Sequence, residues 1–146
     1  MSKSIKDLDL RIQKKAQQLV DSLNTSDFLK SINIEKVTVV ETKRDLATQM
    51  AYYSRGRMET KDVKRMYAAA GLYEPTDIEC RTINTTTLNS VHLTGRAIDI
   101  CPVKDGKLWW NAPQYVWEAI GQKGEELGFQ WGGRWKDFPD SPHFQA

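Results

Sequence analysis

The stretch SVHLTGRAIDICPV, residues 90–103, decides the fold because it joins a polar turn to a strand of a sheet. Residues 96–103 alternate apolar and polar side chains, a pattern typical of a strand with one face in a core. The tripeptide KDG at 104–106 predicts a hairpin turn, and KLWW at 107–110 is expected to be the return strand. The second half of the chain is therefore expected to contain an antiparallel strand pair.

Four other segments carry helical patterns. Their apolar residues recur at helical spacing, which predicts amphipathic helices. These segments are residues 5–23, 45–55, 61–70 and 113–127. Asp45 suits an N-cap, Pro113 suits a first helical turn, and a glycine follows each of the last three segments.

The remaining segments predict strands or irregular chain. Residues 36–42 are rich in β-branched side chains and predict a strand, whereas 72–91 is polar and irregular, with 82–88 as the place for a short strand. Residues 129–135 predict a short strand or loop. The expected fold class is α+β, a small antiparallel sheet with helices packed on it, and 146 residues fit a single domain.

The composition narrows the possible partners. The net charge is only +2 with acids and bases interspersed, which argues against a nucleic-acid partner. No apolar run approaches the roughly 20 residues that cross a bilayer, so no membrane partner is expected. Cys80 and Cys101 lack CxxC spacing and are expected to be free thiols, with pairing in an oxidising compartment left open.

The two histidines of the chain, His92 and His143, both lie near aspartates. Catalytic zinc commonly takes three ligands from histidines and carboxylates. Gly95 allows a turn that points His92 and Asp99 inward, and His143 would arrive from a neighbouring strand. Asp140 would then sit beside the metal without binding it. Spacing alone leaves ordinary structural roles open for each residue, because this ligand pattern is not a tight motif such as HExxH.

Three blocks of sequence resemble the LAS-type zinc peptidases of bacterial cell walls, in the order of that family. Residues 90–99 resemble its SxHxxGxAxD signature. WGGRW at 131–135, followed by DSPHF at 140–144, resembles its second motif. RDLATQ and YSRGR, within 44–57, resemble a third block. The resemblance implies a single peptidase domain over residues 1–146, with an N-terminal helix at about 5–23 and catalytic motifs at 44–143.

The resemblance also implies roles for individual residues. His92, Asp99 and His143 match the ligands of Zn²⁺. Asp140 matches the acid/base that activates water and protonates the leaving amine. Arg44 matches the arginine that polarises the scissile carbonyl, a role that suits the negative charge developing on oxygen.

Three residues are expected more loosely to bind substrate: Ser90, Arg57 and Trp131. The alternatives are a loop hydroxyl for Ser90, a salt bridge or carbonyl cap for Arg57, and a place in the core for Trp131. The chain also departs from the common pattern of the family at residues 41–45, ETKRD, where many relatives carry a glycine and an aromatic before the arginine.

The size and the HLTGRAIDI run are similar to those of single-domain phage endolysins that cut the L-alanyl-D-glutamate bond of the peptidoglycan stem peptide. That activity is the leading hypothesis. A D-alanyl-D-alanine carboxypeptidase or dipeptidase is the alternative, and a non-catalytic wall-binding or structural phage protein is the alternative of another class. No signal peptide is evident, so a monomer held in the host cytoplasm until a holin releases it to the cell wall is expected.

Overall fold

The computed structural model describes all 146 residues and contains a five-stranded antiparallel sheet. Four strands follow the order β1-β2-β5-β4, and β3 pairs with β2. The strands are β1 (Lys36–Glu41), β2 (Ala97–Lys104), β3 (Lys107–Leu108), β4 (Gln130–Trp131) and β5 (His143–Gln145). This arrangement confirms the expected α+β class.

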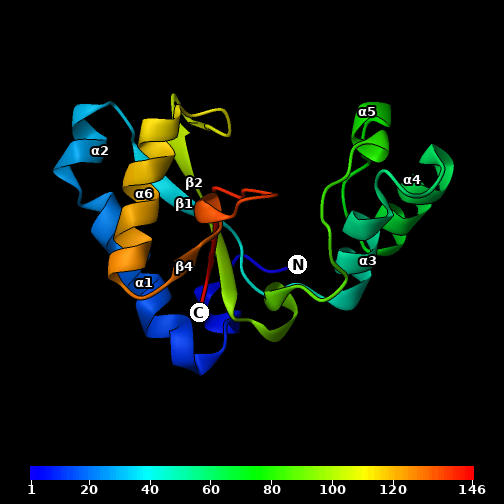
Figure 1. Cartoon of the computed structure of the whole chain (residues 1–146), viewed down its shortest axis with the longest axis horizontal. Coiled ribbons are helices and arrows are strands. Elements are labelled where there is room, and N and C mark those ends of the chain that lie inside the picture. The colour runs from blue at the N-terminus through cyan, green and yellow to red at the C-terminus, as the bar shows by residue number, and fades with distance from the viewer.

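The helices form two groups (Figure 1). One group lies against the sheet: α1 (Leu10–Asn24), α2 (Asp27–Ser31) and α6 (Gln114–Glu126). The other group stands apart from the sheet: α3 (Leu46–Ser54), α4 (Thr60–Ala69) and α5 (Asp77–Arg81). Short 3-10 helices cover Ile5–Asp7, Val91–Thr94 and Gly132–Arg134. None of the helices is both long enough and apolar enough to cross a membrane.

Two separate cores correspond to these two groups. The main core contains 18 buried residues, including Leu19 of α1, Ile100 of β2 and Phe144 of β5. The second core contains only four buried residues, and it lies within the α3–α5 group. Those four are Ala51, Val63, Tyr67 and Cys80. Burial of apolar surface therefore holds the sheet far more strongly than it holds α3–α5.

Several expected elements differ from the structure. The predicted helix 5–23 is broken, because the Asp9 carboxylate caps α1 by accepting from the Arg11 amide. No strand forms in 82–88. Instead, a capping box between Thr76 and Glu79 begins α5. The prediction of irregular chain over 72–91 did not include this helix. The return strand predicted at 107–110 shortens to Lys107–Leu108.

Candidate metal centre

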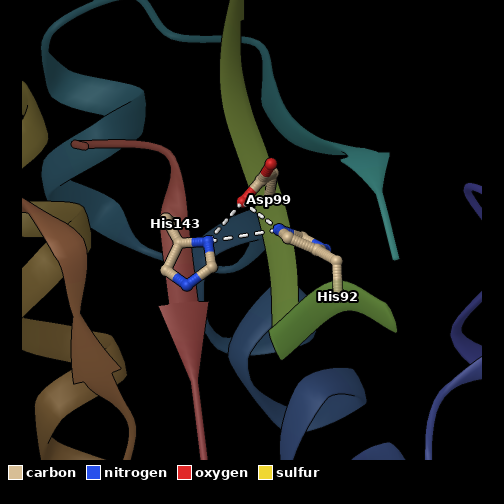
Figure 2. A group of neighbouring side chains, drawn as sticks. All are labelled: His92, Asp99 and His143. Atoms are coloured by element: carbon tan, nitrogen blue, oxygen red, sulfur yellow. Dashed lines mark hydrogen bonds and ion pairs between the residues drawn. The ribbon is translucent and has the colours of Figure 1, made fainter. Parts of the chain in front are cut away.

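Three elements bring His92, Asp99 and His143 together. Asp99 on β2 lies directly opposite His143 on β5 in the antiparallel register. His92 lies on the 3-10 helix Val91–Thr94, which immediately precedes β2. Figure 2 shows the three side chains pointing toward one another from these segments. Pairing between the strands thus supplies two of the three side chains, and a tight turn supplies the third.

The turn depends on Gly95 and Ser90. Gly95 ends the 3-10 helix with a φ of 71°, a left-handed conformation that favours glycine. A Cβ at this position would also lie 3.0 Å from the Asp9 amide nitrogen. The Ser90 hydroxyl caps the same helix by accepting from the His92 amide. Ser90 therefore fixes the backbone of a candidate ligand, in addition to lining the cavity described below.

The three facing atoms have the spacing of metal ligands. Asp99 Oδ1 lies 3.2 Å from His92 Nε2 and 3.1 Å from His143 Nδ1. The two ring nitrogens lie 3.2 Å apart. Atoms held about 2.0–2.1 Å from a tetrahedral zinc ion lie about 3.3 Å from one another. The triangle of donor atoms therefore fits zinc in size as well as in ligand type.

The outer ring nitrogens set the tautomers of both histidines. His92 Nδ1 lies 2.6 Å from the Thr42 carbonyl oxygen, and His143 Nε2 lies 2.9 Å from Gln145 Oε1. Because each outer nitrogen donates its hydrogen to an oxygen, each facing nitrogen presents a lone pair to the centre. Two lone pairs and a carboxylate that converge in this way favour a bound cation.

Interactions among the candidate ligands shift the pKa values of Asp99 and His143. Burial opposes ionisation of Asp99, but contact with the His143 and His92 rings outweighs burial and holds the pKa of this carboxyl below its ordinary range. Burial opposes protonation of His143, but Asp99 outweighs burial and raises its pKa, so a proton competes with a cation for the lone pair of its Nδ1. A negative charge is therefore maintained at the centre, as a divalent cation requires.

Asp140 also lines the cavity, and its environment differs from that of Asp99 because it disfavours the ionised carboxylate. Burial, followed by repulsion from Asp99, raises the pKa of the Asp140 carboxyl. Its backbone nitrogen donates to the Gly132 carbonyl, and its own carbonyl accepts from the His143 amide. A Cβ at Gly132 would lie 2.5 Å from the Asp140 carbonyl oxygen, so glycine is required for this close approach. The WGG motif thus sets the position of Asp140 and His143 together.

Arg44 is buried in the segment between β1 and α3 and lines the same cavity. Its Nε and Nη2 donate to the two carboxylate oxygens of Glu41 at 2.6 and 2.7 Å, and Nη1 donates to Gln49 at 2.7 Å. Its guanidinium also lies 4.8 Å from the centre of the Tyr52 ring. Three of the five N–H groups are used, so one hydrogen on each Nη is left for a substrate oxygen.

A cavity of about 430 Å³ surrounds the centre. The three candidate ligands, Asp140 and Arg44 all line it. One part of the lining is polar and comes from α3 and the segment 84–90, with Arg55, Asn84 and Thr87 among its residues. Another part is aromatic and exposed, formed by Trp110, Trp135 and Phe138. The centre therefore opens onto a pocket large enough for a short peptide.

Two of the expected substrate-binding residues lie outside this lining. Trp131 is 2% exposed and belongs to the main core, where its indole donates to the Ser141 carbonyl. Arg57 donates to the carbonyls of Tyr53 and Thr85 and stacks on the Tyr53 ring. The structure therefore supports the alternatives stated for these two residues: Trp131 is a core residue, and Arg57 caps backbone carbonyl groups.

Other lining residues were not identified from sequence. Glu41 was recognised only as a departure from the family pattern, and the structure shows that it forms an ion pair with Arg44. Arg55, Trp110 and Phe138 had no signal in the sequence, because only the tertiary fold brings them to the cavity.

Comparisons with known proteins agree with this geometry. Residues 83–146, which contain all three candidate ligands, match the family model described as D-alanyl-D-alanine carboxypeptidase. The chain is 28% identical over 137 residues to the peptidoglycan L-alanyl-D-glutamate endopeptidase CwlK of Bacillus subtilis (strain 168), covering 88% of this chain and 70% of CwlK. It is 38% identical over 60 residues to the L-alanyl-D-glutamate peptidase of Listeria phage A118. That match covers 40% of this chain and only 21% of the phage protein, so the chain spans about a fifth of that relative.

Solved structures share the fold. The L-Ala D-Glu endopeptidase ChiX of Serratia marcescens superposes with a TM-score of 0.56 at 21% identity, covering 97% of this chain and 82% of ChiX. The vancomycin resistance D,D-pentapeptidase VanY from the VanB-type cassette, solved with Zn(II), gives 0.52 at 16% identity, covering 95% and 72%. The family match, a relative that spans most of the chain and the common fold together confirm the resemblance to the LAS-type zinc peptidases of bacterial cell walls.

Proposed function

We propose that this protein is a zinc-dependent peptidase that cleaves the stem peptide of peptidoglycan. The observation that carries the proposal is the convergence of three donor atoms, within 4.8 Å of one another, in a cavity that also holds Asp140 and Arg44. A binding protein has no need for a buried carboxyl with a raised pKa beside a metal site. The names of the relatives and of the matched family model support the substrate class.

In the proposed mechanism, His92, Asp99 and His143 hold the zinc ion. When bound, zinc supplies Lewis-acid chemistry and makes water nucleophilic at neutral pH. Asp140 accepts a proton from the attacking water. Burial raises the pKa of this carboxyl, whereas bound zinc would lower it. The position of Asp140 beside the centre suits a group that takes a proton and then returns it.

Arg44 stabilises the charge that develops on the carbonyl oxygen. The free hydrogens on its two Nη atoms are available for this oxygen, while Glu41 and Gln49 hold the guanidinium in place. A carbon–oxygen bond forms, the carbon–nitrogen bond breaks, and Asp140 passes the proton to the leaving nitrogen. The products are a peptide with a new carboxylate and a peptide with a new amine. Fixed donors of this type are typically worth about 3 kcal/mol of barrier each.

The bond between L-alanine and D-glutamate is the proposed target. Two relatives found by sequence carry this specificity in their names, and CwlK matches over most of this chain. The second candidate is a D,D-carboxypeptidase, which the description of the matched family model favours. We also propose, from the phage relative, that the protein acts as a monomeric endolysin that stays in the host cytoplasm until a holin opens a path to the wall.

The test is digestion of purified sacculi, with the new termini identified by mass spectrometry. New C-terminal L-alanine and N-terminal D-glutamate are expected, together with one zinc ion per chain by elemental analysis. Release of D-alanine alone would replace the endopeptidase with the carboxypeptidase. A purified protein without zinc, whose wall lysis is unchanged in the His92→Ala variant, would end the peptidase proposal.

A further inference from the structure

We propose that Arg55 binds the α-carboxylate of the D-glutamate residue on the leaving side of the scissile bond. This inference deepens the proposed function and rests on it. In the stem peptide, D-glutamate continues through its side-chain carboxyl. Its α-carboxylate therefore stays free, next to the nitrogen that leaves, and an endopeptidase that recognises D-glutamate gains from a cation at that place.

Arg55 has the position for this role. It is the C-terminal cap residue of α3, and its side chain lines the cavity that holds the candidate metal centre. Its Nε donates to the Glu79 carbonyl oxygen at 2.7 Å, which anchors the guanidinium from one side. The side chain is half-buried, so it is held by the protein and still reachable from the cavity.

The Arg55 guanidinium also forms no ion pair with a carboxylate of the protein. Arg44 and Arg55 are the two arginines that line the cavity, and no lysine lines it. Arg44 forms a bidentate pair with Glu41, whereas Arg55 has no carboxylate within ion-pair distance. The Glu79 carboxylate accepts instead from the Thr76 amide and the Tyr73 hydroxyl. The Thr76 amide and, more weakly, the charge of Arg55 lower the pKa of Glu79, so this carboxylate interacts with Arg55 from beyond ion-pair distance. A half-buried, anchored cation without a direct ion pair is suited to an anionic group of the substrate.

The surroundings of Arg44 and Arg55 indicate that the two side chains bind different oxygen atoms of the substrate. The Arg44 amide donates to the His92 carbonyl at 3.1 Å, which places Arg44 next to the centre, where it can act on the reacting carbonyl. Arg55 is held on α5 through Glu79, away from the strands that carry Asp99 and His143. The polar lining also includes Asn84 and Thr87, which add uncharged hydrogen-bonding groups to the cavity.

The test compares two substrates that differ only at this carboxylate. One stem peptide carries D-glutamate with a free α-carboxylate, and the other carries the α-carboxamide. The zinc-loaded wild type is expected to cleave the carboxylate form with a kcat/KM on the order of tenfold higher, as for a charge-assisted hydrogen bond. Arg55→Gln is expected to remove this preference, and Arg55→Lys, which keeps the charge, to restore part of it.

Arg57→Gln is the matched control. Arg57 lies two residues away but outside the cavity, so the ratio between the two substrates should not change in this variant. A second readout is the affinity of each variant for the amine product with and without the α-carboxylate, which needs no turnover. Preferential binding of the carboxylate product by the wild type, lost in Arg55→Gln, supports the inference.

The outcomes separate the two proposals. Equal cleavage and equal product binding of both forms by the wild type, with a new L-alanine terminus, would overturn the role of Arg55 and leave the endopeptidase intact. An equal loss on both substrates in Arg55→Gln would make Arg55 a structural residue. Absence of the L-alanine terminus, with carboxylate binding that still depends on Arg55, would end the endopeptidase assignment while the carboxylate site stands. A preference for peptides that end in D-alanine, lost in Arg55→Gln, would move the carboxylate to the substrate terminus and overturn the assignment to D-glutamate.

Discussion

The sheet with α1 and α6 differs from the α3–α5 group in how it is held together. The sheet region has a main core of 18 buried residues, whereas α3–α5 share four. Two of the candidate metal ligands lie on paired strands of the sheet. Arg55, by contrast, ends a helix of the small group. Figure 1 shows the two regions standing apart. Residues of both regions line the cavity.

This difference in packing suits the roles of the two regions, which are metal binding for the sheet and substrate contact for α3–α5. A metal centre requires its donor atoms to be fixed within a few tenths of an ångström, and paired strands over a large core provide that rigidity. Contact with a substrate tolerates more movement, and a region with few buried residues opens locally at lower free energy. We infer that Asp99 and His143 are fixed on the sheet, while the α3–α5 group adapts to the peptide except where Gln49 holds Arg44.

Removal of a metal ligand should have the largest effect. Asp99→Ala is expected to lower kcat/KM on the order of a thousandfold or more, because the variant loses a ligand and leaves two lone pairs without their carboxylate. Zinc content, measured by elemental analysis, should fall with it. Far-UV circular dichroism should stay unchanged, because the main core does not include this side chain. Full activity in a zinc-free Asp99→Ala protein would contradict the metal centre.

Asp140→Asn should separate chemistry from metal binding. Its side chain is nearly the same size, so zinc should remain at one ion per chain while kcat falls about 10²- to 10⁴-fold, the usual contribution of a general acid/base. The measurement is kcat on a defined stem peptide alongside elemental analysis. Loss of the metal in this variant would instead make Asp140 a ligand.

Truncations in the two cores should sharpen the contrast in stability. Leu19→Ala in the main core is expected to cost about 2–5 kcal/mol of unfolding free energy and to lower the urea midpoint of the whole chain. Val63→Ala in the four-residue core is expected to cost less, about 1–2 kcal/mol, and to act locally. Limited proteolysis of the Val63→Ala protein should therefore cut within α3–α5 first. Simultaneous loss of both regions in this variant would show that they unfold as one unit.

The sequence predicted those elements whose signals are local. The strand at 36–42 and the helix at 45–55 follow from β-branched residues and from the Asp45 cap, and both are confirmed with small shifts of their ends. The helix predicted at 5–23 was wrong in its first turns. There the Asp9 amide bonds the Gly95 carbonyl, a contact between residues 86 positions apart that no local pattern indicates.

The residues of the site also divide into those that the sequence indicated and those that only the fold reveals. His92, Asp99 and His143 were accessible because their motifs resemble a known family, and the structure brings them together. Trp131 resembled a cleft residue because it flanks two glycines, but its ring fills the space above Gly133 and belongs to the core. Arg55 was missed because an arginine next to a glycine has many roles, and only the fold shows that its charge lacks a partner.

The smallest predicted effect concerns Asp45, where the α3–α5 group begins. The Asp45 carboxylate accepts from the Thr48 amide and from the N-terminal amine of Met1, and these contacts lower its pKa to about 2. A lowered pKa in the folded state means that the ionised form stabilises the fold above the ordinary pKa of about 3.8. This stabilisation should be lost as the pH falls from about 4 to about 2.

Two variants separate the cap from the charge. Asp45→Ala is expected to cost about 1 kcal/mol at neutral pH, the usual value of a helix N-cap. Asp45→Asn keeps a capping side chain, so it should cost less at neutral pH and show a weaker fall in stability between pH 4 and pH 2. Urea unfolding at several pH values measures both effects. An identical acid dependence in the wild type and Asp45→Asn would mean that other carboxylates control it. A flatter profile in Asp45→Asn would show that the junction between the sheet and α3–α5 is held in part by a single charge.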